Sequence, residues 1–236
     1  MKEFLLTAKE NLIFLCTCLG IFALLFLLAV LAQRLLCRDR RRLSGARTVS
    51  FVAVFGAIAA VLMLIEIPLF FAPSFYKIDL SEIPILICTF YLGPAAGIFC
   101  ELIKVLVKLL IKGTSTAFVG DFANFFVGCS LVFPASVVYH CKKTKKSAVF
   151  GLIIGTLVMT AFGSFFNAVY LLPKFAQLYG LPLEQIISMG TAVNPAISNV
   201  TTLVLFAVVP FNLLKGMIVS VLTLLLYKRV ERLFRR

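Results

Sequence analysis

The chain has 236 residues, of which 61% are hydrophobic and only 14% are charged. Soluble globular domains average about 25% charged residues, so the composition indicates a membrane protein and excludes a sizeable soluble domain. No phosphate-binding loop of the GxxxxGK type occurs in the sequence, so any ATP-driven step would need a partner ATPase.

Residues 12–32 carry no charge and are long enough to span a bilayer, which takes about 20 residues. A cleaved signal peptide is the alternative, but its apolar stretch is usually about 7–15 residues long and its basic residues come before that stretch. We therefore predict an extra N-terminal transmembrane helix within residues 1–36, with Met1 outside. A basic cytoplasmic linker follows at residues 37–47.

Six further spans are predicted from hydropathy between residues 48 and 232. They cover residues 48–65, 83–92, 95–112, 121–139, 147–172 and 200–227. The external segment 66–82 holds prolines and aromatic residues, which favours a structured loop, and the external segment 173–199 has amphipathic character. A basic tail occupies residues 233–236. The predicted fold class is an all-α integral membrane protein with a six-helix core plus one extra N-terminal transmembrane helix.

The net charge of +13 is concentrated in three basic clusters at residues 34–47, 142–146 and 228–236. Short basic segments beside membrane spans mark the cytoplasmic side. We therefore predict that all three segments, including the C-terminus, are cytoplasmic, and that the protein is a multi-pass protein of the cell membrane. Because these basic clusters flank membrane spans, the expected partner of this charge is the lipid bilayer and not nucleic acid.

No catalytic or metal-binding group is predicted. The seven cysteines form no CxxC pair, and most lie in apolar runs, where cysteine behaves as a small hydrophobe. The single histidine, His140, borders a lysine-rich loop and has too few partners for a zinc site. The sequence has no HExxH or GxSxG motif and no paired aspartates within a span, so it does not indicate an enzyme.

Several polar side chains fall at one predicted depth. We expect Pro210 to begin the final helix, which places Asn212 and Lys215 in its first two turns and on one face. At about 1.5 Å rise per residue, Asn124 and Asn167 lie in the outer layer of their own spans. An ionisable side chain inside a bilayer is costly, so a lysine in the company of three asparagines favours a binding site over simple hydrogen bonding between helices.

The span at residues 95–112 carries a polar stripe of Glu101, Lys104, Lys108 and Lys112, because these positions fall within one arc at about 100° per residue. The stripe should face the bundle interior or a watery crevice, although Glu101 and Lys104 would also make a plain internal ion pair. Asparagine and lysine donors among many aromatic residues are typical of a small-molecule site that reads a planar polar heterocycle.

Five stretches together resemble a known family. "FYKIDLSEIPILI", "LGPAAGIFCELIK", "GDFANFFVG", "NAVYLLP" and "PFNLLKG", in this order and spacing, are similar to the riboflavin-specific S component of energy-coupling factor (ECF) transporters. The resemblance runs from residue 47 to about residue 232. It implies a six-helix core that binds riboflavin in a pocket open to the outside. It also implies a partner module, made of a transmembrane scaffold subunit and two ATPases, that drives release inside. Riboflavin is then the transported ligand, and no cofactor is implied.

The resemblance also assigns residues to the ligand. Asn167 of "NAVYLLP", with Asn212 and Lys215 of "PFNLLKG", matches the family's contacts to the isoalloxazine ring. Segment 66–82 matches the loop that covers the pocket. The full set of predicted substrate-binding residues is Asn167, Asn212, Lys215, Asn124, Tyr76, Asp79 and Lys104. Whether Lys215 also pairs with a carboxylate such as Asp79 is left open by the sequence.

A separate surface is implied for the scaffold subunit. Ala53 and Ala57 match an alanine pair, four residues apart, on which the scaffold packs, and small residues at this spacing let helices approach closely. The family core begins in the cytoplasm, so the helix within residues 1–36 departs from the family pattern. That helix must leave the alanine pair uncovered for coupling to work.

Other functions stay open at this point. The ligand of the same fold could be flavin mononucleotide (FMN) or another vitamin, since Lys104 and Lys108 would favour a phosphate. A stand-alone secondary transporter or a membrane enzyme is a second alternative, but the sequence shows no proton-relay chain and no catalytic set. A purely structural membrane subunit is the third, and it leaves the polar layer without a role.

Overall fold

The computed structural model describes residues 2–36, 45–70, 73, 76–114 and 116–234, with side chains between residues 16 and 230 of those ranges. Within them, five helical stretches are long and apolar enough to cross a membrane. The helices are α1 (Lys2–Leu36), α2 (Gly45–Leu64), α3 (Glu82–Leu92), α4 (Pro94–Lys112), α5 (Val119–Lys142), α6 (Lys145–Phe166), α7 (Leu172–Tyr179), α8 (Leu183–Thr191), α9 (Val200–Leu203) and α10 (Val209–Phe234).

Two π-helical segments join consecutive helices without a break. The first, η1 (Asn167–Leu171), links α6 to α7, and the second, η2 (Val204–Val208), links α9 to α10. A small hairpin of β1 (Ile67–Pro68) and β2 (Lys77–Ile78) follows α2, and its two strands pair antiparallel. Each predicted span therefore coincides with helix, and the predicted all-α membrane fold is confirmed.

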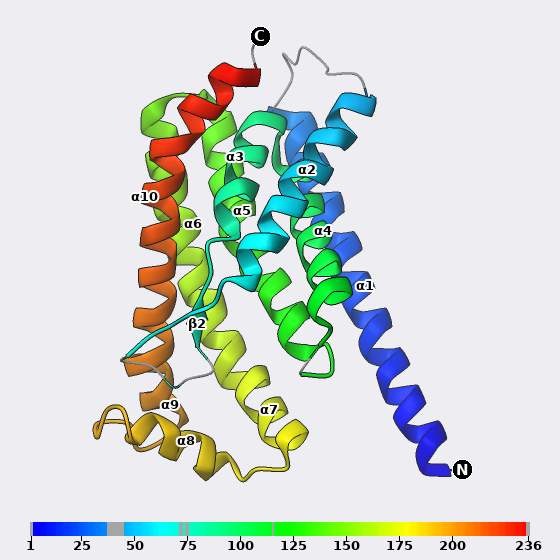
Figure 1. Cartoon of the computed structure of the whole chain (residues 1–236), viewed down its shortest axis with the longest axis vertical. Helices are drawn as coiled ribbons and strands as arrows, with labels where there is room; N and C mark the ends of the chain where they lie inside the picture. The colour runs from blue at the N-terminus through cyan, green and yellow to red at the C-terminus, as the bar shows by residue number, and fades with distance from the viewer. Residues whose placement is uncertain (1, 37–44, 71–72, 74–75, 115, 235–236) are drawn as a thin grey trace.

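The long helices run between two ends of the bundle (Figure 1). One end, here called the basic end, holds the end of α1, the start of α2 and the end of α10. It carries Arg34, Arg47, Lys143 and Arg229. The other end, here called the hairpin end, holds the β1–β2 hairpin together with α7 and α8. The predicted linker at 37–47 and tail at 233–236 fall largely outside the described residues.

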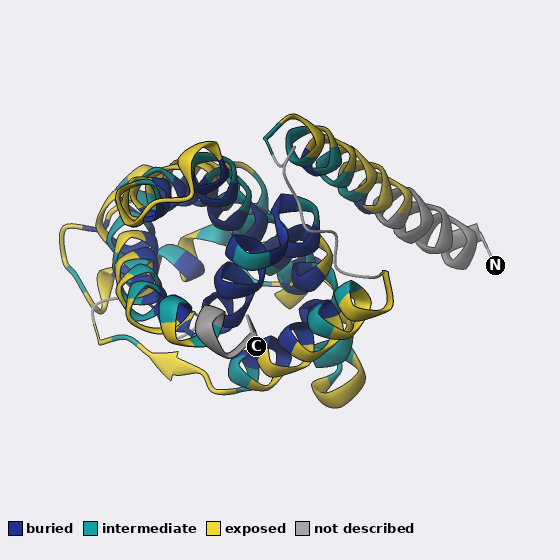
Figure 2. Cartoon of the chain, turned by 90° about the horizontal axis from the view of Figure 1, so that it is seen from above, coloured by how far each residue is buried: buried dark blue, intermediate teal, exposed yellow. Residues whose placement is uncertain are grey.

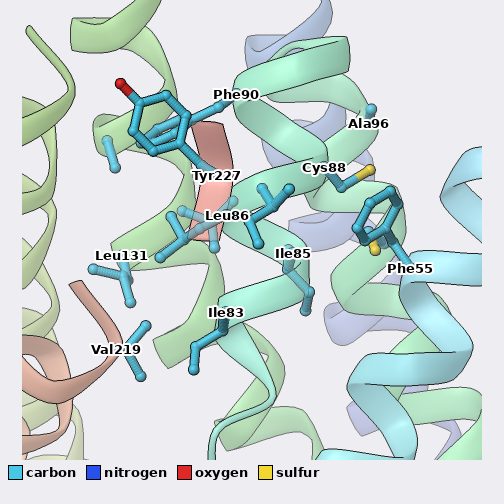
Figure 3. Close-up of a cluster of buried hydrophobic side chains, with 14 of the residues drawn as sticks. Phe55, Ile83, Ile85, Leu86, Cys88, Phe90, Ala96, Leu131, Val219 and Tyr227 are labelled. Atoms are coloured by element: carbon cyan, nitrogen blue, oxygen red, sulfur yellow. The ribbon is translucent and has the colours of Figure 1, made fainter. Parts of the chain in front are cut away.

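Helix α3 lies in the middle of the bundle, where it packs against α2, α4, α5 and α10. Its sequence, "EIPILICTFYL", is apolar on every side after the first residue, as expected of a helix that is buried all round. Ile85, Leu86 and Cys88 are completely buried (Figure 3), and Phe90 stacks on Tyr139. The short apolar span predicted at 83–92 is thus the core of the fold.

Helix α1 lies at the edge of the bundle (Figure 2). It packs on α4 and α5, where Phe22 contacts Phe125 and Phe26 contacts Phe99, each with ring centroids 5.9 Å apart. Gln33 adds a polar tie, because its side-chain oxygen accepts a hydrogen bond of 3.2 Å from the backbone N–H of Ala95. That N–H lies in the first turn of α4, where it has no partner within the helix.

The expected start of the final helix at Pro210 is wrong. The helix begins ten residues earlier, where the Asn199 side chain accepts a hydrogen bond of 2.8 Å from the Thr202 N–H in a capping box. The π-helical turn η2 ends at Val208, two residues before Pro210, and its wider winding accommodates the ring and missing N–H that would disrupt an ordinary α-helix. Lys215 then lies about 22 Å along the helix from Val200, near its middle rather than near its outer end.

Candidate functional site

Five ionisable side chains meet in the interior of the bundle and are here called the buried ionic cluster. They come from the segment before α3, from the first residue of α3, from α4 and from α10. They are Asp79, Glu82, Glu101, Lys104 and Lys215, and none exposes more than 5% of its surface. A buried charge is tolerated only when it is paired, so the arrangement of these groups is fixed by their mutual contacts.

Lys215 is paired with two carboxylates. Its Nζ lies 3.0 Å from Oδ2 of Asp79 and 3.2 Å from Oε1 of Glu82. The structure therefore answers the question that the sequence left open, because Asp79 is a partner of Lys215. Asp79 lies just after the β1–β2 hairpin, so this ion pair ties the segment that follows α2 to the middle of α10.

Lys104 continues the cluster toward α4. Its Nζ lies 3.2 Å from the same Oε1 of Glu82 and 2.7 Å from Oε2 of Glu101, which confirms the predicted Glu101–Lys104 ion pair. Glu82 is thus ion-paired with two lysines and joins α3 to α4 and α10. Glu82 was not among the residues predicted from the sequence. Its signal was an acidic residue directly before an all-apolar run, a position where the positive end of a helix dipole favours negative charge.

Glu101 fits only because α5 has a glycine opposite it. A β-carbon at Gly128 would lie 2.6 Å from Oε1 of Glu101, closer than such atoms approach in proteins. Neither carboxylate oxygen of Glu101 makes a hydrogen bond among the described residues, although Oε2 is ion-paired with Lys104. The cluster contains three carboxylates against two ammonium groups, so negative charge is in excess around Lys104 and Lys215.

A second group forms around Gly163 of α6. Tyr76 donates a hydrogen bond of 2.9 Å from Oη to Oδ1 of Asn167, and Nδ2 of Asn167 donates one of 2.8 Å to the Gly163 carbonyl. Asn212 contacts the same glycine, since a β-carbon at Gly163 would lie 3.0 Å from Nδ2 of Asn212. The Nδ2 donor of Asn212 is buried and has no hydrogen-bond partner among the described residues. The structure therefore brings Tyr76, Asn167 and Asn212 together, as predicted for residues that share a site.

Asn212 also connects the two groups. It precedes Lys215 by three residues on α10, so both side chains lie on one face of that helix. Phe211 packs its ring 5.3 Å from the ring of Tyr76, centroid to centroid. Amide donors, an ammonium group and two aromatic rings thus converge between α6, α10 and the segment before α3. Such a setting suits a planar ligand with polar edges.

Asn124 lies apart from this convergence. It is half-buried on α5, on the same face as Asp121 and Gly128, and its Oδ1 makes no hydrogen bond among the described residues. Asp121 pairs with Lys108, whose Nζ also donates a hydrogen bond of 3.1 Å to the Gly113 carbonyl. The described contacts therefore place Asn124 beside the polar stripe of α4 and do not join it to Asn167 or Asn212.

The outer part of the α4 stripe is paired at the hairpin end. The Glu66 carboxylate binds Lys77 at 2.6 Å and Lys112 at 2.7 Å, linking the hairpin to the end of α4. Hydrogen bonds to Lys112 and then to Lys77 lower the pKa of Glu66, which outweighs its partial burial. Each lysine of the stripe thus has a carboxylate partner, so the stripe is a row of ion pairs.

Comparison with known proteins decides the family. The model of the family "ECF transporter, substrate-specific component" matches residues 47–227. The chain belongs to this family. Like other S components, it is then the part of an ECF transporter that is specific for the substrate, and the matched range contains every residue of the buried ionic cluster and of the Gly163 group.

Individual relatives agree with the assignment of this chain to the S components. The chain is 36% identical to the riboflavin transporter RibU of Staphylococcus aureus over 78% of this chain and 90% of that protein. It is 30% identical to the riboflavin transporter FmnP of Bacillus subtilis over 76% of this chain and 90% of that protein. A solved structure of the S component of a bacterial ECF transporter superposes with a TM-score of 0.63 at 34% identity, covering 81% of this chain and 99% of the solved one.

The predicted scaffold-contact residues of the S component lie on an open helix face. Ala53 and Ala57 are exposed on α2, beside the exposed Val54 and Ile58. Helix α1, which precedes the range that the family matches, packs on α4 and α5 and leaves both alanines exposed. The described part of the extra helix therefore does not cover this face.

Proposed function

We propose that this S component binds riboflavin from outside the cell and passes it to the inside with the help of an ECF module of one scaffold subunit and two ATPases. The observation that carries the proposal is the 36% identity to a riboflavin transporter over most of both chains. The family match at residues 47–227 includes Asn167, Asn212 and Lys215, which the resemblance assigns to the isoalloxazine ring.

The geometry supports a flavin as the ligand. The isoalloxazine ring is planar and carries carbonyl and ring-nitrogen acceptors along one edge. The unpartnered Nδ2 of Asn212 and the ammonium group of Lys215 are donors on one helix face, and Asn167 offers a second amide. A ligand that enters the pocket loses its hydrogen bonds to water, and donors that are already fixed in place compensate for this loss. Here Asn212 is held against Gly163, and Lys215 is held by the buried carboxylates.

The proposed direction rests on charge. Basic segments favour the cytoplasmic side, so we place the basic end in the cytoplasm and the hairpin end outside. The segment that carries Tyr76 and Asp79 comes from the hairpin end and contacts both Asn167 and Lys215. This segment is the proposed cover of the pocket, and its opening would admit riboflavin from the outside.

A titration tests the proposed ligand directly. The purified chain should quench the fluorescence of added riboflavin and bind it with a one-to-one stoichiometry. Absence of quenching at micromolar riboflavin would contradict the proposal, provided that a thermal unfolding transition shows that the preparation is folded. A parallel titration with an unrelated vitamin, such as biotin, in competition against riboflavin shows whether the site is selective.

FMN is the alternative ligand within the same family. Lys104 and Lys108 are both paired with carboxylates, and the buried ionic cluster carries an excess of negative charge. A phosphate dianion would meet Asp79, Glu82 and Glu101, and like charges repel strongly in a poorly solvated interior. We therefore propose that riboflavin displaces bound FMN more readily than FMN displaces riboflavin, which a competition titration measures.

A further inference from the structure

An apolar cleft lies between α1, α2 and α4 near the basic end. Its volume is about 250 Å³. Phe26 and Gln33 of α1 form one wall, Val49 and Ala53 of α2 the second, and Ala95 and Phe99 of α4 the third. None of the residues that line it belongs to the Gly163 group or to the buried ionic cluster.

The lining of the cleft suits hydrocarbon. Only Gln33 and Thr48 among the lining residues carry polar side chains, and both lie at the basic end. The Gln33 side-chain oxygen is already used by the backbone N–H of Ala95. The remaining walls offer methyl groups and aromatic rings. An apolar occupant is stabilised by packing against them, whereas a polar group buried there would lose its hydrogen bonds to water without replacement.

The dimensions of the cleft favour a slender occupant. Along α4 its lining runs from Ala95 to Ile103, about 12 Å of helix, which is most of the roughly 15 Å depth of one bilayer leaflet. One acyl chain of a leaflet lipid matches this length, and it is slender enough to lie along the helices that form the walls.

Positive charge lies at the end of the cleft that Gln33 and Thr48 line. Arg34 lies in the last turn of α1 and Arg47 in the first turn of α2, and both are exposed. The sequence holds four more arginines between them, outside the described residues. Basic pockets between transmembrane helices on the cytoplasmic side bind anionic lipid head groups. The head group that complements this charge is an anionic phosphate.

We propose that the cleft binds one anionic phospholipid of the cytoplasmic leaflet, with an acyl chain between α1, α2 and α4 and its phosphate at Arg34 and Arg47. The proposal uses the membrane orientation given above and is independent of the ligand of the S component. The bound lipid fills the space between the extra helix and the core. It also lies next to Ala53, so it forms one border of the exposed alanine face.

Native mass spectrometry of the full chain tests the site. The chain is purified in mild detergent and offered phosphatidylglycerol and phosphatidylcholine in equal amounts. We expect one tightly held phosphatidylglycerol per chain. Ala95→Phe fills the cleft and should abolish this retention, whereas Val221→Phe adds the same side chain to an exposed position on α10 and should leave it intact.

The head-group contact is tested by charge removal. Arg34→Gln and Arg47→Gln should each reduce the preference for phosphatidylglycerol about fivefold, which is about 1 kcal/mol for each arginine near the surface. Arg229→Gln removes an exposed arginine from the basic end of α10 and should leave the preference unchanged. Thermal unfolding confirms that each variant is folded, without reference to riboflavin.

Three results would overturn the proposal. Equal retention of the two lipids by the unmodified chain would show that the site does not select an anionic head group. Retention that survives Ala95→Phe would show that the lipid binds elsewhere. No retained lipid, together with loss of ECF-module assembly in Ala95→Phe but not in Val221→Phe, would assign the cleft to a partner helix.

Discussion

Lys215 is held between Asp79 and Glu82, three residues along one face of α10 from Asn212. An ammonium group at mid-helix costs a great deal of free energy unless it is paired, and these two carboxylates provide the pairing. Asn212 differs, because its Nδ2 is buried without a hydrogen-bond partner among the described residues. The two neighbours therefore bring to the site one donor that is already paired and one that is not.

The first prediction concerns these two donors. Asn212→Ala and Lys215→Ala should each weaken riboflavin binding about tenfold or more. Losing one buried hydrogen-bond partner costs about 1–3 kcal/mol, and about 1.4 kcal/mol corresponds to a factor of ten. Fluorescence titration gives the affinities. Asn194→Ala, in the turn between α8 and α9, is the matched control and should bind normally. Unchanged affinity in Asn212→Ala would remove this residue from the site.

The second prediction concerns the glycine opposite Glu101. Gly128→Ala should destabilise the protein by about 1–3 kcal/mol, because its β-carbon would force the Glu101 carboxylate out of the buried ionic cluster. Gly20→Ala places the same methyl group on α1, where no atom lies within 4 Å, and should be neutral or slightly stabilising. Thermal unfolding in detergent compares the two, and equal effects would argue against tight packing at Gly128.

Helix α2 presents the exposed alanine face, and this element separates binding from coupling in the proposed function. Ala57→Trp should prevent assembly with the ECF module, because a large side chain keeps two helices apart where small residues let them approach. Riboflavin affinity should not change, since Ala57 lies outside the site. Co-purification with the module measures assembly, and Val221→Trp on α10 is the control. Normal assembly of Ala57→Trp would move the scaffold contact elsewhere.

The elements that the sequence predicts well are those with a one-dimensional signal. Hydropathy located the spans, and the apolar run after Glu82 marked the central helix α3. The start of the last helix was misplaced because Pro210 is a strong local signal, whereas a π-helical turn that accommodates it leaves no clear mark in the sequence. Glu82 was missed because its role depends on Lys104 and Lys215, which approach it only in the folded bundle.

At the scale of the whole molecule, α1 is an addition beside a complete core. The family match begins at residue 47, and both the buried ionic cluster and the Gly163 group lie after that point. Deletion of residues 2–36 should therefore leave riboflavin binding intact, lower thermal stability through loss of the Gln33 tie, and abolish phosphatidylglycerol retention. Titration, thermal unfolding and native mass spectrometry of one preparation measure all three. Loss of riboflavin binding would show that α1 shapes the site.

Residues 76–79, around strand β2, bind two of the three residues assigned to the flavin ring: Tyr76 binds Asn167, and Asp79 binds Lys215. A ligand that takes these groups must exchange with the chain's own side chains. The affinity that a titration reports is then a difference between two sets of bonds, one to the vitamin and one to an internal competitor. Selection can tune uptake by changing the competitor alone, without altering any atom that touches the ring.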